Sequence, residues 1–201
     1  LGKEKNKITI VTGAATSRLT NEDCAPNTGI HYLMDTIALS NVVGKAIVKD
    51  GGDSWFFLTA DYAFGHSLEK DTGDVVRAAG GRVAGAVRHP LATGDFSSFL
   101  LQAQASKAKV IGLANAGGDT TNAIKQAYEF GIVKGGQTLA GLLVFLTDIH
   151  SLGLEKAQGL YLTETFYWDL NDQTRAWSKR FAALNSGKYP SMDQAGVYAG
   201  I

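Results

Sequence analysis

Short, almost wholly apolar runs recur along the 201-residue chain, and segments with helical spacing separate them. The run at 55–59 reads WFFLT, and the run at 109–114 reads KVIGLA. A strand can be apolar at nearly every position when helices cover both faces of a parallel sheet. Strands that alternate with helices form right-handed βαβ units. We therefore predict an α/β fold with a parallel, doubly wound sheet.

The alternation continues through nearly the whole chain. Further strands are expected at 7–12, 83–87, 139–146 and 159–165, and helices at 32–49, 65–79, 120–130 and 174–185. A helix is also expected in DFSSFLLQAQA, with Asp95 as its N-cap. Residues 13–29 are polar and have no period, which predicts a long loop. The apolar pattern at 196–201 stops without a cap, which predicts that the chain is part of a longer protein.

Composition excludes several function classes. The 19 basic residues balance 19 acidic ones, so neither a nucleic-acid partner nor a polybasic membrane signal is indicated. No apolar run approaches the roughly 20 residues that a membrane helix needs. Cys24 is the single cysteine, and no two of the four histidines have the spacing of a metal site, so no metal is expected. Residues 1–7 are charged and do not form a signal peptide.

Enzyme motifs are weak. The turn TGAATS at 12–17 resembles the start of a dinucleotide-binding loop, but only Gly13 of the three required glycines is present. No Gly-x-Ser-x-Gly elbow occurs, and Glu69, Asp71 and Asp74 fit a solvated helix face. We therefore predict no catalytic residues, no cofactor and no enzyme activity.

Loops at strand ends are better candidates for a site. The segment AGGDTT at 116–121 follows a strand, and two interpretations stay open: a turn with a helix cap, or a loop that faces a small polar ligand. Tyr62 and Phe64 lie in the short strand-to-helix turn DYAFG and are candidate walls of a small-molecule pocket. The aromatic cluster at 166–168 is interpreted as packing.

Four segments carry a resemblance to a known family: ITIVTGAATSRLT, WFFLTADYAFGHSLEKD, HPLATGDFSSFLLQAQASKAKVIGLANAGGDT and LLVFLTDIHSLGLEKAQGLYLTETFYWD. Together they resemble the type I solute-binding proteins of ABC importers, in particular the branched-chain amino-acid-binding family. The resemblance implies two α/β lobes with a ligand held between them. It implies that residues 1–34 belong to the first lobe, 35–165 form the second lobe, and 166–201 return to an incomplete first lobe.

The resemblance also implies a set of ligand-binding residues. Ala14, Ala15 and Thr16 match the carboxylate-binding loop of the first lobe, where a backbone amide and the Thr16 hydroxyl would hold an anionic oxygen. Phe64 matches the aromatic residue that closes the pocket from the second lobe.

Two further positions depart from the pattern of amino-acid binders. Asn115 matches a wall position that is often aromatic in the family, and Asp148 falls near the acidic residue that binds an ammonium group. Position 64 departs as well, since Phe64 stands where the family usually has Tyr. These departures argue against an α-amino acid, whereas an aromatic or short-chain carboxylic acid would need no partner for an ammonium group.

The implied function is the capture of a small carboxylate-bearing solute, either a branched-chain amino acid, an aromatic acid or an amide. Capture would take place in the periplasm, or at the outer surface on a membrane tether, and the solute would be delivered to the permease of an ABC importer. Two alternatives remain: a ligand-sensing receptor domain of the same fold, and, less favoured, an NAD(P)-dependent oxidoreductase.

Overall fold

The computed structural model describes residues 1–30 and 34–200, which form two compact units. Unit 1 combines Leu1–Asp35 with Glu164–Ile201, and unit 2 is the continuous segment Thr36–Thr163. These bounds lie within two residues of the ones predicted for the lobes. That the units correspond to the two lobes of a longer protein stays a prediction.

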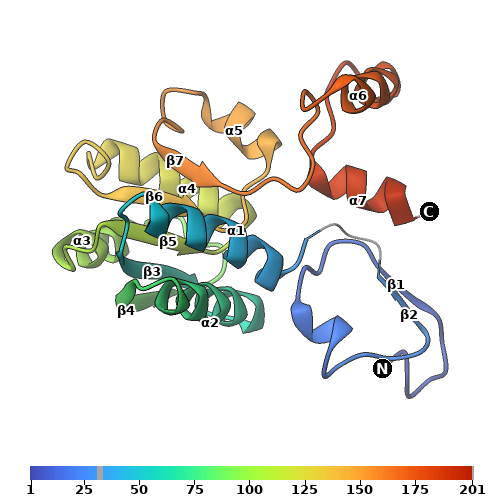
Figure 1. Ribbon diagram of the computed structural model, residues 1–201, viewed down its shortest axis with the longest axis horizontal. Coiled ribbons are helices and arrows are strands. Elements are labelled where there is room, and N and C mark those ends of the chain that lie inside the picture. The colour runs from blue at the N-terminus through green and yellow to red at the C-terminus, as the bar shows by residue number, and fades with distance from the viewer. Residues whose placement is uncertain (31–33, 201) are drawn as a thin grey trace. The chain divides into compact units, whose positions relative to one another are not determined.

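A five-stranded parallel sheet forms the centre of unit 2 (Figure 1). Its strands follow the order β4-β3-β5-β6-β7, and every neighbouring pair is parallel. The strands are β3 (Ser54–Ala60), β4 (Arg82–His89), β5 (Val110–Ala114), β6 (Thr138–Gly141) and β7 (Leu160–Leu162). All residues of β3 and β5 are buried, as the apolar runs predict. The predicted parallel α/β fold is confirmed.

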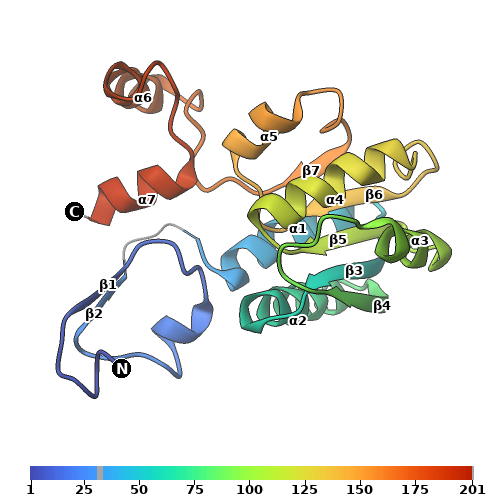
Figure 2. The same ribbon diagram turned by 180° about the vertical axis from the view of Figure 1, so that it is seen from behind.

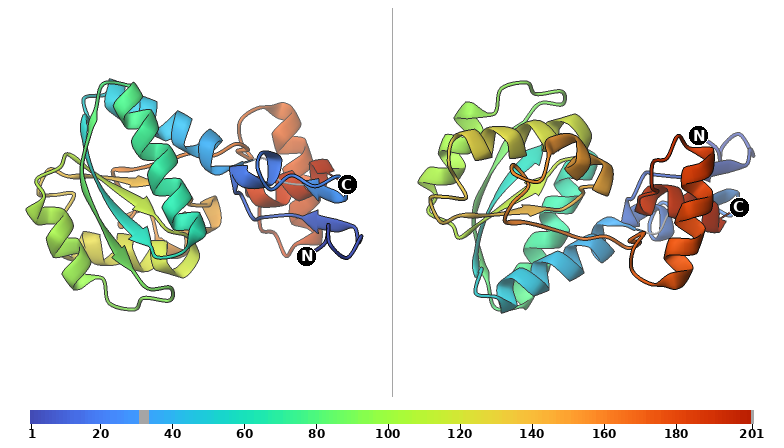
Figure 3. Two further views of the ribbon diagram at one scale, coloured as in Figure 1. Left: turned by 90° about the horizontal axis from the view of Figure 1, so that it is seen from below. Right: turned by 90° about the horizontal axis from the view of Figure 1, so that it is seen from above.

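Helices cover both faces of this sheet, as the opposite views of Figures 1 and 2 and the end views of Figure 3 show. The helices α1 (Thr36–Lys49) and α2 (Ala63–Ala78) pack against each other on one face. The other face carries α3 (Ser97–Ala105), α4 (Gly117–Glu129) and α5 (Leu146–Leu152). The sheet is therefore doubly wound.

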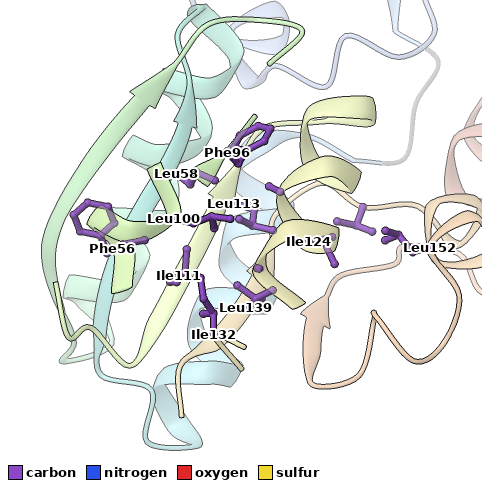
Figure 4. Packing of buried hydrophobic residues seen from close by; sticks show 14 of the residues in the cluster. Phe56, Leu58, Phe96, Leu100, Ile111, Leu113, Ile124, Ile132, Leu139 and Leu152 are labelled. Carbon is purple, nitrogen blue, oxygen red and sulfur yellow. The ribbon is translucent and has the colours of Figure 1, made fainter. Parts of the chain in front are cut away.

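The apolar core on the α3–α4–α5 face explains how the sequence pattern becomes packing (Figure 4). Phe56 and Leu58 of β3 contribute to this core together with Leu100 of α3 and Ile124 of α4. Because side chains alternate along a strand, Trp55 and Phe57 point to the opposite face. Each fully buried large side chain contributes roughly 1.5–3 kcal/mol.

The strand order places a topological switch point between β3 and β5. The chain runs from β3 outward to β4, and then crosses back to β5 on the other side of β3. In open α/β sheets, the crevice at the carboxyl ends of two such strands is where ligands bind. The loops after β3 and β5 are therefore the part of unit 2 to inspect for a site.

Unit 1 contains a short parallel pair of strands, β1 (Thr9–Val11) and β2 (Thr28–Ile30), and a 3-10 turn, η1 (Ser17–Thr20). Its second segment forms α6 (Asp172–Leu184) and α7 (Met192–Gly200). The Asn171 side chain caps α6 by accepting a hydrogen bond from the Thr174 amide at 3.0 Å. The ring centroid of Trp177 in α6 lies 5.7 Å from that of Phe181 and 5.1 Å from that of Tyr198.

Three local predictions were wrong: the extent of the strand at 139–146, the continuous loop at 13–29, and the position of Asp95 as an N-cap. The apolar run at 139–146 is a strand only as far as Gly141; residues 142–144 stay buried without being a strand, and Leu146 begins α5. Periodicity cannot separate a strand from a buried connection when both are apolar. Residues 13–29 contain η1 and the start of β2, so they are not one continuous loop.

Asp95 precedes the N-cap position of α3, although its carboxylate does accept a hydrogen bond from the Ser97 amide at 2.8 Å. The start of the helix predicted at 32–49 lies outside the described residues, since Tyr32 and Leu33 are not among them.

Candidate functional site

The turn after β3 brings Tyr62 and Phe64 to the carboxyl edge of the sheet. The Asp61 amide donates to the His89 carbonyl at 2.8 Å, which ties the end of β3 to the end of β4. Helix α2 then begins at Ala63, and the rings of Tyr62 and Phe64 are half-buried with centroids 5.9 Å apart.

Gly65 allows this turn to be so tight. A Cβ at this position would lie 2.1 Å from the Ala60 carbonyl oxygen and 3.1 Å from that of Ala114. The first turn of α2 therefore packs directly on the ends of β3 and β5, the two strands of the switch point. The structure thus brings Tyr62 and Phe64 to the edge where a site was predicted.

Electrostatics connect Tyr62 to the loop after β5. Burial raises the pKa of the Tyr62 hydroxyl, and the negative charge of Asp119 raises it further. Tyr62 follows β3, whereas Asp119 lies in the first turn of α4, directly after β5. The two sides of the switch point are therefore close enough for their polar groups to interact.

Asn115 is the first residue after β5, and its side chain is fully buried. Its amide nitrogen lies 3.1 Å from His89 Nε2, and its amide oxygen accepts a hydrogen bond from the Thr120 hydroxyl at 2.7 Å. The other nitrogen of His89 lies 2.8 Å from the Pro90 carbonyl oxygen. These contacts fit a neutral imidazole that donates from Nδ1 and accepts at Nε2. This arrangement does not favour contact of Asn115 with a solute, and that role stays a prediction.

The segment 116–121 forms the start of α4, which begins at Gly117 with a positive φ of 57°. The carboxylate of Asp119, only 8% exposed, accepts hydrogen bonds from the amides of Ala92 and Thr93 at 3.2 and 2.9 Å. The hydroxyl of Thr121 donates to the Gly118 carbonyl at 3.1 Å. Because the polar side chains have partners within unit 2, the structure favours the interpretation as a turn and helix start.

Asp148 lies in the first turn of α5, and one oxygen of its carboxylate accepts a hydrogen bond from the Phe145 amide at 2.9 Å. Burial raises the pKa of this carboxyl, and the bond from Phe145 opposes that rise in part. The group thus caps α5 at the same sheet edge. Its predicted interaction with a solute ammonium group stays a prediction.

The remaining candidates, Ala14, Ala15 and Thr16, lie in unit 1 between β1 and η1. Ala14 is exposed, whereas Ala15 is buried and has a positive φ of 47°. The Thr16 hydroxyl accepts a long hydrogen bond of 3.4 Å from the Arg18 amide at the start of η1. The residues therefore form a sharp turn with a half-buried hydroxyl, and their contact with a carboxylate stays a prediction.

The turn after β1 does not continue as a dinucleotide-binding loop would. A pyrophosphate site needs a glycine-rich turn that leads into a helix, but here a single 3-10 turn, Ser17–Thr20, follows. Within residues 1–30 and 34–200, no group of three or more His, Cys, Asp or Glu side chains could hold a metal ion. No helix in that part of the chain has the length and apolar character that a membrane span requires.

The sequence analysis did not single out His89, and it named Asp119 only as one member of the segment 116–121. Both sit at the end of an apolar strand pattern or just after it, and that position was the available signal. It could not show that their side chains turn inward. Such burial depends on partners that lie 26 or 27 residues away in the chain.

Solved structures resemble this chain closely. A periplasmic binding protein from Burkholderia mallei is 57% identical, with a TM-score of 0.91, over 98% of this chain and 52% of that one. A branched chain amino acid ABC transporter periplasmic ligand-binding protein from Burkholderia xenovorans LB400 is 38% identical, with a TM-score of 0.83, over 98% and 52% of the two chains.

A more distant structure shares the fold. An ABC transporter solute binding protein from R. palustris, solved in complex with benzoate, is 23% identical with a TM-score of 0.84, over 99% of this chain and 54% of that one. The present chain thus spans about half the length of these solved relatives. A search of curated protein sequences gave no match.

A family model described as "periplasmic binding protein" matches residues 2–201. This match and the two Burkholderia structures agree with the parallel, doubly wound sheet of unit 2. The chain therefore belongs to the periplasmic binding protein family and has its type I fold.

Proposed function

We propose that this chain is part of the solute-binding component of an ABC importer, which captures a small carboxylate-bearing solute in the periplasm and delivers it to a membrane permease. The observation that carries the proposal is the position of Tyr62 and Phe64 at the switch point between β3 and β5 in a member of this family. Half-buried aromatic rings at such an edge are suited to cover the apolar part of a small molecule.

In unit 1, Ala14, Ala15 and Thr16 are the residues proposed to donate hydrogen bonds to a carboxylate. In unit 2, Tyr62 and Phe64 are the residues proposed to contact the apolar part of a solute, and Asp148 is proposed to contact a polar group of it. The Asn115 side chain is buried, so it would support these residues from inside unit 2 without contact with the solute.

The chemical class of the solute is supported by the relatives. The Burkholderia xenovorans protein is described as a branched chain amino acid transporter protein, and the R. palustris protein holds benzoate. A carboxylate is common to these two kinds of molecule.

Capture requires no chemical step. A micromolar dissociation constant corresponds to roughly −8 kcal/mol. Two or three hydrogen bonds to a carboxylate contribute about 1.5–3 kcal/mol each, and burial of an aromatic ring adds about 25 cal/mol per Å². With three such bonds at the upper value and a ring that buries about 200 Å², the gain is about 14 kcal/mol before the cost of ordering is subtracted. Hydrogen bonding and burial thus suffice for capture and release without a reactive group.

The test is the affinity of the Thr16→Ala variant of the full-length protein for benzoate and L-leucine, measured by calorimetry. Loss of one charge-assisted hydrogen bond should weaken binding of whichever acid the wild type binds by about 10–150-fold. Thr20→Ala is a matched control, because the Thr20 hydroxyl is exposed and donates to the Ser17 carbonyl of the same segment. An affinity equal to that of the wild type would reject the role of Thr16. Chemical conversion of the bound acid would contradict the proposal as a whole.

A further inference from the structure

Three side chains of α4 hold the loop that connects β4 to α3. Asp119 accepts from the amides of Ala92 and Thr93 at 3.2 and 2.9 Å. Asn122 donates to the Thr93 carbonyl at 3.3 Å. Gln126 donates to the Gly94 carbonyl at 2.9 Å and accepts from the Phe96 amide at 2.7 Å.

The spacing of these side chains explains how one helix can hold an irregular segment. Positions 119, 122 and 126 are three and four residues apart, so they lie along one face of α4. Together they bond five backbone groups in residues 92–96. The α4 side chains thus supply the hydrogen-bond partners that backbone groups in a strand or helix would find in neighbouring backbone.

The loop is held in a conformation that it would not adopt readily by itself. Ala92 has a positive φ of 59°, which is unfavourable for a residue with a side chain. The amide of that same residue is one of the two bound by the Asp119 carboxylate. Asp119 is also nearly buried, which makes its bonds to the loop difficult for water to replace.

The position of the loop connects it to the candidate site. It leaves the carboxyl end of β4, next to the end of β3, from which Tyr62 emerges. The Asp119 carboxylate that binds the loop is also the charge that acts on the Tyr62 hydroxyl. Asp119 of α4 therefore binds the loop through hydrogen bonds and acts on Tyr62 through its charge alone.

We propose that Asp119, supported by Asn122 and Gln126, is a positioning residue that holds the loop of residues 90–96 as a fixed wall beside Tyr62 at the solute site. The inference rests on the proposed function, because it assigns Asp119 an effect on solute binding without contact with the solute. A loop fixed in this way loses no conformational freedom when the solute binds, so removal of its support lowers affinity.

The experiment combines hydrogen exchange and calorimetry on the full-length protein with benzoate and L-leucine as probes. Asp119→Ala should speed exchange of the Ala92 and Thr93 amides at least about tenfold, because both lose their acceptor. It should weaken binding of the acid that the wild type binds by about tenfold. Asp119→Asn keeps one acceptor oxygen but turns an amide nitrogen toward the second donor, so it should restore part of both losses. Glu129→Ala, an exposed acidic position on the same helix, is the control that should change neither.

Each outcome has a distinct meaning. Faster exchange with unchanged affinity would overturn the proposal, since Asp119 would then serve the stability of the lobe alone. Unchanged exchange would overturn it as well. If Asp119→Ala does not fold, Gln126→Ala supports or overturns the proposal by the same two measurements. If the wild type binds neither acid, the proposed function fails for these probes, and the same assay with the acid that thermal-shift screening identifies decides the role of Asp119.

Discussion

Unit 2 and unit 1 differ in how much of their apolar surface they bury. Trp55 and Phe57 of unit 2 are fully buried. In unit 1, Ile8, Ile10 and Leu184 are 85%, 64% and 93% exposed. An open groove of about 690 Å³ between α6 and α7 is lined largely by apolar side chains, including those of Trp177 and Phe181.

The two units also differ in their continuity along the chain. Unit 2 is one segment in which each strand is followed by the helix that covers it, so sequence neighbours bury one another. Unit 1 is assembled from two segments separated by the whole of unit 2, and its β1–β2 sheet has only two strands. A two-stranded sheet is too small to bury an apolar face by itself. Three pairs of substitutions, each with one member in unit 2 and one in unit 1, test where the two units differ and where they behave alike.

The largest contrast is expected for one leucine in each unit. Leu58→Ala removes a fully buried side chain and should lower the free energy of unfolding by about 2–5 kcal/mol. Leu184→Ala alters a side chain that is 93% exposed and should change it by less than about 0.5 kcal/mol. Urea unfolding of the 201-residue chain, followed by circular dichroism, measures both. Equal costs would show that the two units do not differ in this way.

A smaller contrast is expected for hydroxyl groups. Thr120→Val deletes the donor to the buried Asn115 amide oxygen and should cost about 1–3 kcal/mol, because that oxygen loses a partner out of reach of water. Thr20→Val in unit 1 deletes an exposed hydroxyl and should cost less than about 0.5 kcal/mol. The same urea experiment compares them. A cost for Thr120→Val no greater than that for Thr20→Val would contradict the importance of the His89–Asn115–Thr120 contacts.

The smallest effect concerns two carboxyl groups and should be alike in the two units. Burial raises the pKa of Asp148 in unit 2 and of Asp193 in unit 1 above the value in the unfolded chain. The folded state therefore holds its proton more tightly, and this contribution to stability grows as the pH falls from neutral through the folded pKa. Asp148→Asn and Asp193→Asn should each gain stability relative to the wild type at neutral pH and lose that advantage in acid.

The control for this pH dependence is Asp74→Asn. A hydrogen bond from Lys70 holds the pKa of the Asp74 carboxyl below its usual value, so its contribution is lost as the pH falls through that lowered pKa. Thermal unfolding between about pH 7 and pH 3 should show the opposite sign for this variant. The same sign in all three variants would mean that burial is not what separates Asp148 and Asp193 from Asp74.

Much of unit 2 could be predicted from the sequence, because the apolar runs of its strands and the spacing of its helices are local patterns. The apolar run WFFLT became β3, and helical spacing marked α2 and α4 to within a few residues. It failed at 139–146, where a buried connection is as apolar as the strand before it. It also missed β2, because that short strand pairs with β1 across a polar segment and carries no strong pattern of its own.

Candidate site residues divide in the same way. Tyr62 and Phe64 were recognisable because their position depends on a short turn between a strand and a helix. Asp119 was not, because its role comes from contact with Ala92 and Thr93, which follow a different strand. Asn115 was predicted as a wall and lies inside, since its orientation depends on His89 and Thr120 together.

By itself, the sequence determined the class of fold and the order of most strands and helices of unit 2, because burial on both faces of a strand requires apolar residues at every position. Only the tertiary structure decided which polar groups at the carboxyl edge turn inward. That choice depends on whether a buried donor finds its acceptor on another element, and such a partner is specified by the packing of the whole unit.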